Sequence, residues 1–146
     1  MNNPQLTIAV PCFNEEQFII DTLKSIQQQT YLNYLVDIYD NNSSDRTLKI
    51  LHEFCQKDHR FRINKSLMNI GLLNNFRKSL NLSKSEYFMW MGAHDLIEVN
   101  YLSELTNSLN QDPSLALAFP KITYLSLGVT IESEGGLKTN LRIFLH

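Results

Sequence analysis

The sequence has almost no net charge and no long apolar run, and each absence excludes a class of protein. Its 146 residues include 13 Lys and Arg against 15 Asp and Glu, a net charge of −2. Because nucleic acids and anionic membranes are bound through clustered positive charge, this balance gives no reason to expect either as a partner. No window approaches the roughly 18 apolar residues that a membrane-spanning helix needs. We therefore expect no nucleic acid partner and no transmembrane segment.

Cysteine is also scarce. The two cysteines, Cys12 and Cys55, match no zinc-site spacing and form no disulfide framework. They are typical of reduced thiols packed as small apolar side chains. The polar N-terminal residues Met1–Pro4 lack the apolar core of a signal peptide. These features predict a cytoplasmic protein, and they leave peripheral attachment at the inner face of the membrane open.

The chain is short enough to form a single domain over residues 1–146. Three mainly apolar or β-branched runs predict strands, and segments with helical spacing of apolar residues follow them. Strands that alternate with helices favour a mostly parallel sheet with right-handed crossovers, in a three-layer α/β/α arrangement. The glycine-punctuated pieces after residue 120 are predicted to be hairpins. The three strands are Leu6–Val10, Leu35–Tyr39 and Tyr87–Met91.

Local signals also predict where these elements begin and end. Pro11 lacks a backbone N–H, so the first strand is expected to stop there. Asn14–Gln17 has the pattern of a capping box for the first helix, and Ser44 is predicted to cap the second. Asp45 is expected to have a structural role in the first turn of that second helix. Gly71 is expected to supply a positive φ angle in a turn.

Polar residues gather where each predicted strand ends. Asn14 and Glu15 follow the first strand, Asp40 ends the second, and Gly92-Ala93-His94-Asp95 follows the third. In open α/β sheets, ligands bind at the edge formed by the carboxyl ends of the strands. We therefore expect one ligand site to be built from these three strand ends.

The order of these motifs resembles that of the family 2 glycosyltransferases. The resemblance lies in four segments: Val10-Pro11-Cys12-Phe13-Asn14-Glu15, Tyr39–Thr47, Asn69-Ile70-Gly71, and the strand Tyr87–Met91 that leads into Asp95. The resemblance runs from about Leu6 to about Thr123. It implies the Rossmann-like GT-A fold of nucleotide-diphospho-sugar transferases, with the acceptor-side portion absent or incomplete. It also implies an inverting transferase that moves a sugar to an acceptor hydroxyl, in surface polysaccharide or glycolipid synthesis.

The resemblance assigns roles to residues at the strand ends. Asp40 would accept a hydrogen bond from the ring N–H of a pyrimidine, a charge-assisted contact. Pro11, Phe13 and Glu15 would form the base pocket on the first loop. Asn69 and Gly71 would form a turn near the diphosphate or ribose, with Asn75 and Arg77 on the following helix. A UDP-sugar is the favoured donor.

A divalent cation, Mn²⁺ or Mg²⁺, is implied because it neutralises the charge on the diphosphate leaving group. Asp95 matches the final aspartate of the family's metal-binding element and is the expected ligand. His94 stands where the family usually has a second carboxylate, and an imidazole there would favour a transition metal. His94 is therefore a candidate for the donor site, and a plain polar role for it stays open.

The catalytic base is not assigned by the sequence. General-base catalysis needs a carboxylate or similar group within hydrogen-bond reach of the acceptor hydroxyl. The late candidates Glu132, Glu134 and His146 sit in no recognisable context. Two alternatives therefore stay open: a nucleotide-sugar-binding module without turnover, and a doubly wound signalling domain with Asp40 as phospho-acceptor. The partner expected on the main interpretation is a saccharide or lipid-linked acceptor.

Overall fold

All strands of the described chain lie in one parallel sheet. The computed structural model describes residues 4–82, 84–112, 114–115, 117–118 and 143–144. The sheet order is β3-β2-β1-β4-β6-β5. The elements in chain order are β1 (Leu6–Cys12), α1 (Ile19–Gln27), β2 (Tyr34–Asp40), α2 (Thr47–Cys55), β3 (Phe61–Ile63), α3 (Leu72–Leu82), β4 (Tyr87–Trp90), α4 (Tyr101–Gln111), β5 (Leu117–Ala118) and β6 (Ile143–Phe144).

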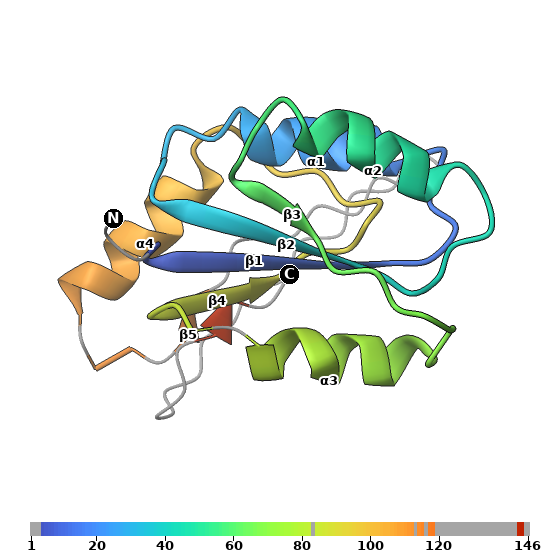
Figure 1. The fold of residues 1–146 in the computed structure, drawn as a ribbon. Coiled ribbons are helices and arrows are strands. Elements are labelled where there is room, and N and C mark those ends of the chain that lie inside the picture. The colour runs from blue at the N-terminus through green and yellow to red at the C-terminus, as the bar shows by residue number, and fades with distance from the viewer. Residues whose placement is uncertain (1–3, 83, 113, 116, 119–142, 145–146) are drawn as a thin grey trace, which may run out of the picture.

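Helices cover both faces of this sheet. Helices α1 and α2 lie on one face and α3 lies on the other (Figure 1). The larger apolar cluster combines side chains of α1, α2 and α4 with one face of the strands, whereas a smaller cluster packs Leu80 of α3 against the opposite face. The predicted three-layer α/β/α fold is confirmed.

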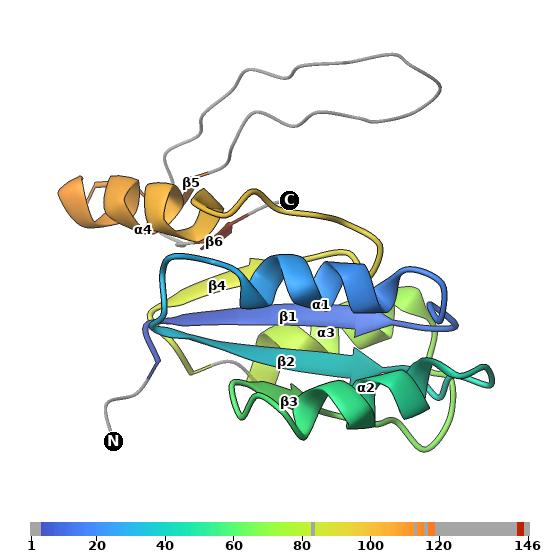
Figure 2. The same ribbon diagram turned by 90° about the horizontal axis from the view of Figure 1, so that it is seen from above.

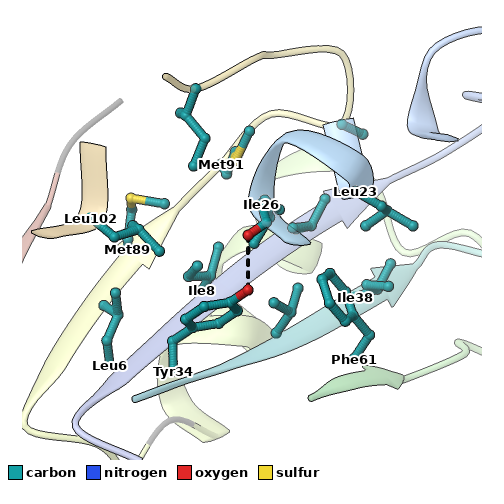
Figure 3. Close-up of a cluster of buried hydrophobic side chains, with 14 of the residues drawn as sticks. Leu6, Ile8, Leu23, Ile26, Tyr34, Ile38, Phe61, Met89, Met91 and Leu102 are labelled. Atoms are coloured by element: carbon teal, nitrogen blue, oxygen red, sulfur yellow. Dashed lines mark hydrogen bonds between the residues drawn. The ribbon is translucent and has the colours of Figure 1, made fainter. Parts of the chain in front are cut away.

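The middle strand β1 is buried along its whole length, as its apolar sequence predicts. It pairs in parallel with β2 from Leu6↔Tyr34 to Cys12↔Asp40, and with β4 from Leu6↔Tyr87 to Ala9↔Trp90. Figure 3 shows Leu6 and Ile8 in the apolar cluster beneath α1, where the Tyr34 hydroxyl donates to the Ile26 carbonyl at 2.8 Å. This packing fixes β1 between the strands whose ends build the site.

Pro11 does not end β1, which was the prediction. The backbone of Ala9 faces β4, because its carbonyl accepts from the Met91 N–H at 2.9 Å. Residues two apart in a strand face the same neighbour, so Pro11 also faces this side. The ladder between β1 and β4 has ended by that point, at Ala9↔Trp90. The missing N–H therefore does not interrupt the ladder on the other side of β1, where Pro11 pairs with Tyr39 in register.

The C-terminal strands of the described chain are parallel to their neighbours. β6 pairs with both β4 and β5 in parallel. The segments predicted as hairpins after residue 120 fall almost entirely within 119–142, outside the described residues.

A polar cluster joins α1, β2 and the turn before β3. Asp58 accepts from the Arg60 guanidinium at 2.6 Å and from Gln27 Nε2 at 3.1 Å. The Arg60 guanidinium carbon lies 4.7 Å from the centre of the Tyr34 ring, a cation–π distance. Hydrogen bonding to Arg60 lowers the pKa of the Asp58 carboxyl to about 2.

This pKa predicts an acid-dependent contribution to stability. Because the folded-state pKa lies below the ordinary value of 3.8, ionised Asp58 stabilises the fold above about pH 4, and this contribution is lost as the pH falls toward 2. Since Arg60 keeps part of its surface in water, we expect about 1–2 kcal/mol. Urea unfolding at pH 6 and pH 2.5 should show that Asp58→Asn costs less stability at the lower pH. An equal difference at both values would contradict this origin.

Candidate functional site

A cavity of about 350 Å³ opens at the edge of the sheet where β1, β2 and β4 end. Figure 2 shows β1 and β2 pointing to the same end of the molecule. Three of the predicted site residues do not line the cavity: Asp40 and Asp95, which lie at this edge, and Arg77, which is exposed on α3. The other seven do line it: Pro11, Phe13, Glu15, Asn69, Gly71, Asn75 and His94.

The loops after β1 and β2 are bonded to each other. Asn14 has a φ of 57°, a left-handed conformation that asparagine adopts more readily than most residues. Its N–H donates to Ser43 Oγ at 3.0 Å, and its Oδ1 accepts from the Ser44 N–H at 2.8 Å. These contacts hold the segment that carries Phe13 and Glu15 against the cavity.

Both predicted helix caps are wrong, because Asn14 and Ser44 bond to each other instead of to the first turns of α1 and α2. The side chain of Asn14 bonds the loop at Ser44, so the Asn14–Gln17 capping box does not form, and α1 begins at Ile19 without a side-chain cap. Ser44 likewise does not cap α2. Instead, Asp45 Oδ1 accepts from the N–H of Thr47, the first residue of α2, at 2.9 Å, which is the predicted structural role of Asp45.

Asp40 and Asn41 follow each other at the end of β2 but have different surroundings. Asp40 is 0% exposed, and both its carboxylate oxygens lie 3.3 Å from the Ser43 N–H, so it closes the turn after β2. Asn41 lines the cavity. Sequence reasoning assigned the base contact to Asp40, which stays a prediction, and missed Asn41. Because consecutive residues of a strand point to opposite sides, only one of Asp40 and Asn41 is expected to face the cavity. The alternation alone does not say which of the two it is.

Asn41 and Asn69 form a pair, here called the amide latch, that ties β2 to the turn before α3. Asn41 Nδ2 donates to Asn69 Oδ1 at 2.8 Å, and Asn41 Oδ1 accepts from the Ile70 N–H at 2.9 Å. The Gly71 N–H donates to Asn69 Oδ1 at 2.8 Å. Gly71 has a φ of +82°, which confirms the predicted positive angle. The amide latch therefore forms one wall of the cavity.

The first turns of α3 continue this wall with Leu72, Asn75 and Phe76. The sequence pattern places Leu72 and Phe76 among the core positions of this helix, but Leu72 is 70% exposed. Asn75 is 2% exposed, and its Nδ2 donates to the Tyr39 carbonyl at 2.8 Å. Within the described part of the chain, Asn75 Oδ1 accepts no hydrogen bond. A buried acceptor left unmatched costs about 1–3 kcal/mol, so this atom is an unusual feature of the wall.

A closed turn follows β4. The Gly92 N–H donates to Asp95 Oδ2 at 3.0 Å, and the Asp95 N–H donates to the Gly92 carbonyl at 3.1 Å. The turn projects His94 into solvent at the mouth of the cavity, where its Nδ1 lies 3.6 Å from Glu15 Oε1. His94 and Glu15 thus bring the loops after β4 and β1 together.

The described side chains at this edge offer too few oxygen ligands to bind a divalent cation by themselves, so a bound diphosphate would have to supply the others. In the described ranges, no three His, Cys, Asp or Glu side chains gather as a metal site. Asp95 turns toward the Gly92 N–H, and His94 is close to one carboxylate, that of Glu15. Mg²⁺ at nucleotide sites usually takes one or two protein carboxylates and completes its shell with phosphate oxygens and water. The donor set here suits that arrangement.

Cys12 lines the cavity but is poorly suited to act as a nucleophile. Burial, with the nearby Asp40 and Glu15 carboxylates, raises the pKa of its thiol far above the usual range. Burial also raises the pKa of Cys55, to about 11. Both thiols are free and stay protonated at neutral pH.

Three predicted candidates cannot be placed. Glu132, Glu134 and His146 lie outside the described residues. The described helices span at most 11 residues, and none of them has the length and apolar character to cross a membrane.

The parallel sheet, with helices on both faces and a cavity at its carboxyl edge, defines an α/β domain. The chain belongs to glycosyl transferase family 2, whose model matches residues 7–131. It is 29% identical over 136 residues to an uncharacterized glycosyltransferase of Haemophilus influenzae, covering 93% of this chain and 41% of that protein. It is 26% identical over 110 residues to a poly-β-1,6-N-acetyl-D-glucosamine synthase of Staphylococcus epidermidis, covering 75% of this chain and 26% of that protein.

Solved structures show the same fold. Staphylococcus aureus TarS in complex with UDP superimposes with a TM-score of 0.76 at 21% identity, over 86% of this chain and 38% of that one. The mannosyltransferase PcManGT from Pyrobaculum calidifontis, in complex with GDP-Man and Mn²⁺, gives 0.73 at 20% identity, over 83% and 36%. The predicted GT-A fold is thereby confirmed. The chain spans less than half the length of each of these relatives.

Proposed function

We propose that the cavity binds a nucleotide-diphosphate sugar and that the chain forms the donor-binding part of an inverting glycosyltransferase. The observation that carries this proposal is the convergence of seven predicted site residues on one cavity at the carboxyl edge of the sheet. It is supported by neighbours of the same fold in complex with UDP, UDP-GlcNAc and GDP-Man. The reaction transfers the sugar to an acceptor hydroxyl on a saccharide or a lipid-linked saccharide, in surface polysaccharide or glycolipid synthesis.

The roles of the lining residues follow from their chemistry. Phe13 is 42% exposed and offers a flat apolar surface to a base, beside Pro11. The amide latch and Gly71 offer polar atoms and a bare backbone to the ribose or diphosphate. Asp40 stays in the proposal as a nucleotide contact, at the turn that also presents Asn41 to the cavity.

A divalent cation, Mn²⁺ or Mg²⁺, would be held by Asp95 and by the diphosphate, with His94 beside it. When bound, it neutralises charge that builds up on the departing diphosphate. Cys12 and Cys55 are both free thiols, which suits a reducing compartment. We therefore propose a cytoplasmic location and, more specifically, peripheral attachment at the inner face of the membrane.

Binding of UDP to the full chain tests the proposal directly. We expect saturable binding by isothermal titration calorimetry, strengthened by Mn²⁺. The single tryptophan, Trp90, gives a second signal, because its ring centre lies 6.0 Å from that of Phe76 in the cavity wall. Failure of every nucleoside diphosphate to bind, with and without metal, would contradict the function.

A turnover assay separates the two functional alternatives. Release of free UDP from a UDP-sugar in the presence of acceptor saccharides is expected of a transferase. Equilibrium binding of the UDP-sugar without release would support a binding module without turnover.

A further inference from the structure

Positive charge is concentrated in one segment of the chain. Residues 59–85 contain six of the 13 Lys and Arg residues and none of the 15 Asp and Glu residues, although the net charge of the chain is −2. The segment contains α3, which lies on the face of the sheet opposite α1 and α2 (Figure 1). The two basic residues nearest β3, Arg60 and Arg62, pair with aspartates. Among the described residues, the other four form no ion pair: Lys65, Arg77, Lys78 and Lys84.

The same segment exposes large apolar side chains. Leu67 is 97% exposed, and Met68 beside it is also exposed, in the turn between β3 and α3. Leu72 and Leu73 in the first turn of α3 are exposed as well, and so is Leu82 at its end. These five are half of the exposed large apolar residues of the described chain. The turn 65–70 and the outer side of α3 are here called the α3 surface.

The fold fixes this turn but gives Leu67 and Met68 nothing to pack against. Just before them, the Ser66 N–H donates to the Asp40 carbonyl at 2.8 Å, and Lys78 Nζ donates to Ser66 Oγ at 3.2 Å. Just after them, the amide latch holds the chain to β2. A turn that is fixed on both sides loses little conformational entropy when its tip is buried by a partner.

The chemistry of the α3 surface suits an anionic lipid bilayer. Apolar side chains on a basic surface enter the boundary between headgroups and acyl chains, while Lys and Arg attract the anionic headgroups. Lysine is depleted at interfaces between proteins, whereas three of the four unpaired basic residues here are lysines. The charge of the surface therefore favours a membrane over a protein partner.

We propose that the α3 surface docks on an anionic phospholipid bilayer, with Leu67 and Met68 inserted between the lipids. This inference rests on the proposed function, because it identifies the surface by which the chain would attach to the inner face of the membrane. Leu72 belongs both to the α3 surface and to the cavity wall. Docking therefore brings the mouth of the cavity close to the bilayer, where a lipid-linked acceptor lies.

Vesicle sedimentation of the chain tests the inference, first by comparing lipids. We expect the wild type to bind vesicles of phosphatidylcholine mixed with phosphatidylglycerol at least tenfold more tightly than vesicles of phosphatidylcholine alone. High salt should weaken this binding, because it screens the attraction between basic side chains and anionic headgroups.

A second comparison locates the apolar contact. Leu67→Ser/Met68→Ser should bind the mixed vesicles at least tenfold more weakly than the wild type, because both inserted side chains are gone. The matched control is Leu32→Ser, since Leu32 is exposed on the loop between α1 and β2, at the amino ends of the strands. It should bind as the wild type does. The fluorescence of Leu67→Trp should shift to shorter wavelength on mixed vesicles, whereas that of Leu32→Trp should not.

A third comparison locates the charge contact. Lys65→Gln/Lys84→Gln removes two unpaired charges from the two ends of the α3 surface and should weaken binding at low salt at least tenfold. Lys24→Gln/Lys49→Gln changes the net charge by the same amount on α1 and α2, on the other face of the sheet. This control should bind as the wild type does.

Several results would overturn the inference while leaving the proposed function intact. Equal binding to both kinds of vesicle, binding to neither, or equal losses in the control variants would each do so. Dimers in sedimentation velocity that Leu67→Ser/Met68→Ser abolishes, without vesicle binding, would assign the surface to a second copy of the chain.

UDP binding keeps the two proposals apart. No side chain substituted in these variants lines the cavity, so each variant should keep the wild-type affinity for UDP. If Leu67→Ser/Met68→Ser loses UDP and vesicle binding together, the turn is only structural and the inference is wrong. Failure of the wild type to bind any nucleoside diphosphate would contradict the proposed function, whereas the vesicle comparisons would still decide whether the α3 surface binds lipid.

Discussion

Replacing Asn41 with alanine is expected to weaken UDP binding by about ten- to a hundredfold. The side chain is 3% exposed and makes both bonds of the amide latch, one to Asn69 and one to the Ile70 N–H. Its removal takes the acceptor from the Ile70 N–H and one of two donors from Asn69 Oδ1, and so releases the turn that carries Gly71. Each 1.4 kcal/mol lost from binding is a factor of ten in the dissociation constant, which calorimetry measures.

The control is Asn81→Ala, which removes the same side chain from an exposed position near the end of α3. It should bind UDP as the wild type does. Asp40→Ala tested alongside compares the neighbouring residue that the sequence favoured. If Asn41→Ala is folded by circular dichroism and its affinity is unchanged, the amide latch does not form the binding wall.

Replacing Gly92 with alanine is expected to displace the Asp95 carboxylate and weaken Mn²⁺-dependent UDP binding at least tenfold. A Cβ at Gly92 would lie 2.3 Å from Asp95 Oδ2, closer than such atoms approach in proteins. Asp95 must rotate away, which breaks its bond to the Gly92 N–H and costs about 1 kcal/mol of folding stability. Titration of UDP with Mn²⁺ and with EDTA, together with urea unfolding, measures both effects.

A double substitution identifies the clash as the cause. In Asp95→Ala the obstructing side chain is gone, so adding Gly92→Ala should have little further effect on stability or binding. Additive losses in the double variant would show that Gly92 is needed for its backbone and not for the space it leaves to Asp95.

The sequence predicts the framework well because each strand carries its own signal. The runs at Leu6–Val10, Leu35–Tyr39 and Tyr87–Met91 are mainly apolar, which is typical of strands covered on both faces. Their order relative to the helices then favours a parallel sheet, and parallel strands bring their polar ends to one edge. This is why residues as distant as Pro11 and His94 line the same cavity.

The errors arise where residues bond to a loop distant in sequence. Asn14 has the composition of a helix cap, but it bonds Ser44, thirty residues away. Pro11 breaks an isolated strand, but here it faces the side on which the β1–β4 ladder has already ended. Local patterns do not contain either fact.

The choice between Asp40 and Asn41 also depends on geometry that the sequence does not state. The backbone leaves β2 at Asp40 and reaches a φ of 63° at Asn42. This path turns the carboxylate of Asp40 toward the Ser43 N–H and leaves the amide of Asn41 in the cavity. Residue type favours the charged Asp40 as the ligand contact, whereas the path of the backbone directs the side chain of Asn41 into the cavity.

The strand order has a consequence for synthesis on the ribosome. β1, β2 and β4 lie within the first 90 residues and can pair as soon as β4 emerges. β5 contacts the sheet only through β6, which follows it by 25 residues. The edge at β1, β2 and β4 is therefore expected to assemble before β6 is synthesised, while β5 joins the sheet only after β6 has paired with β4.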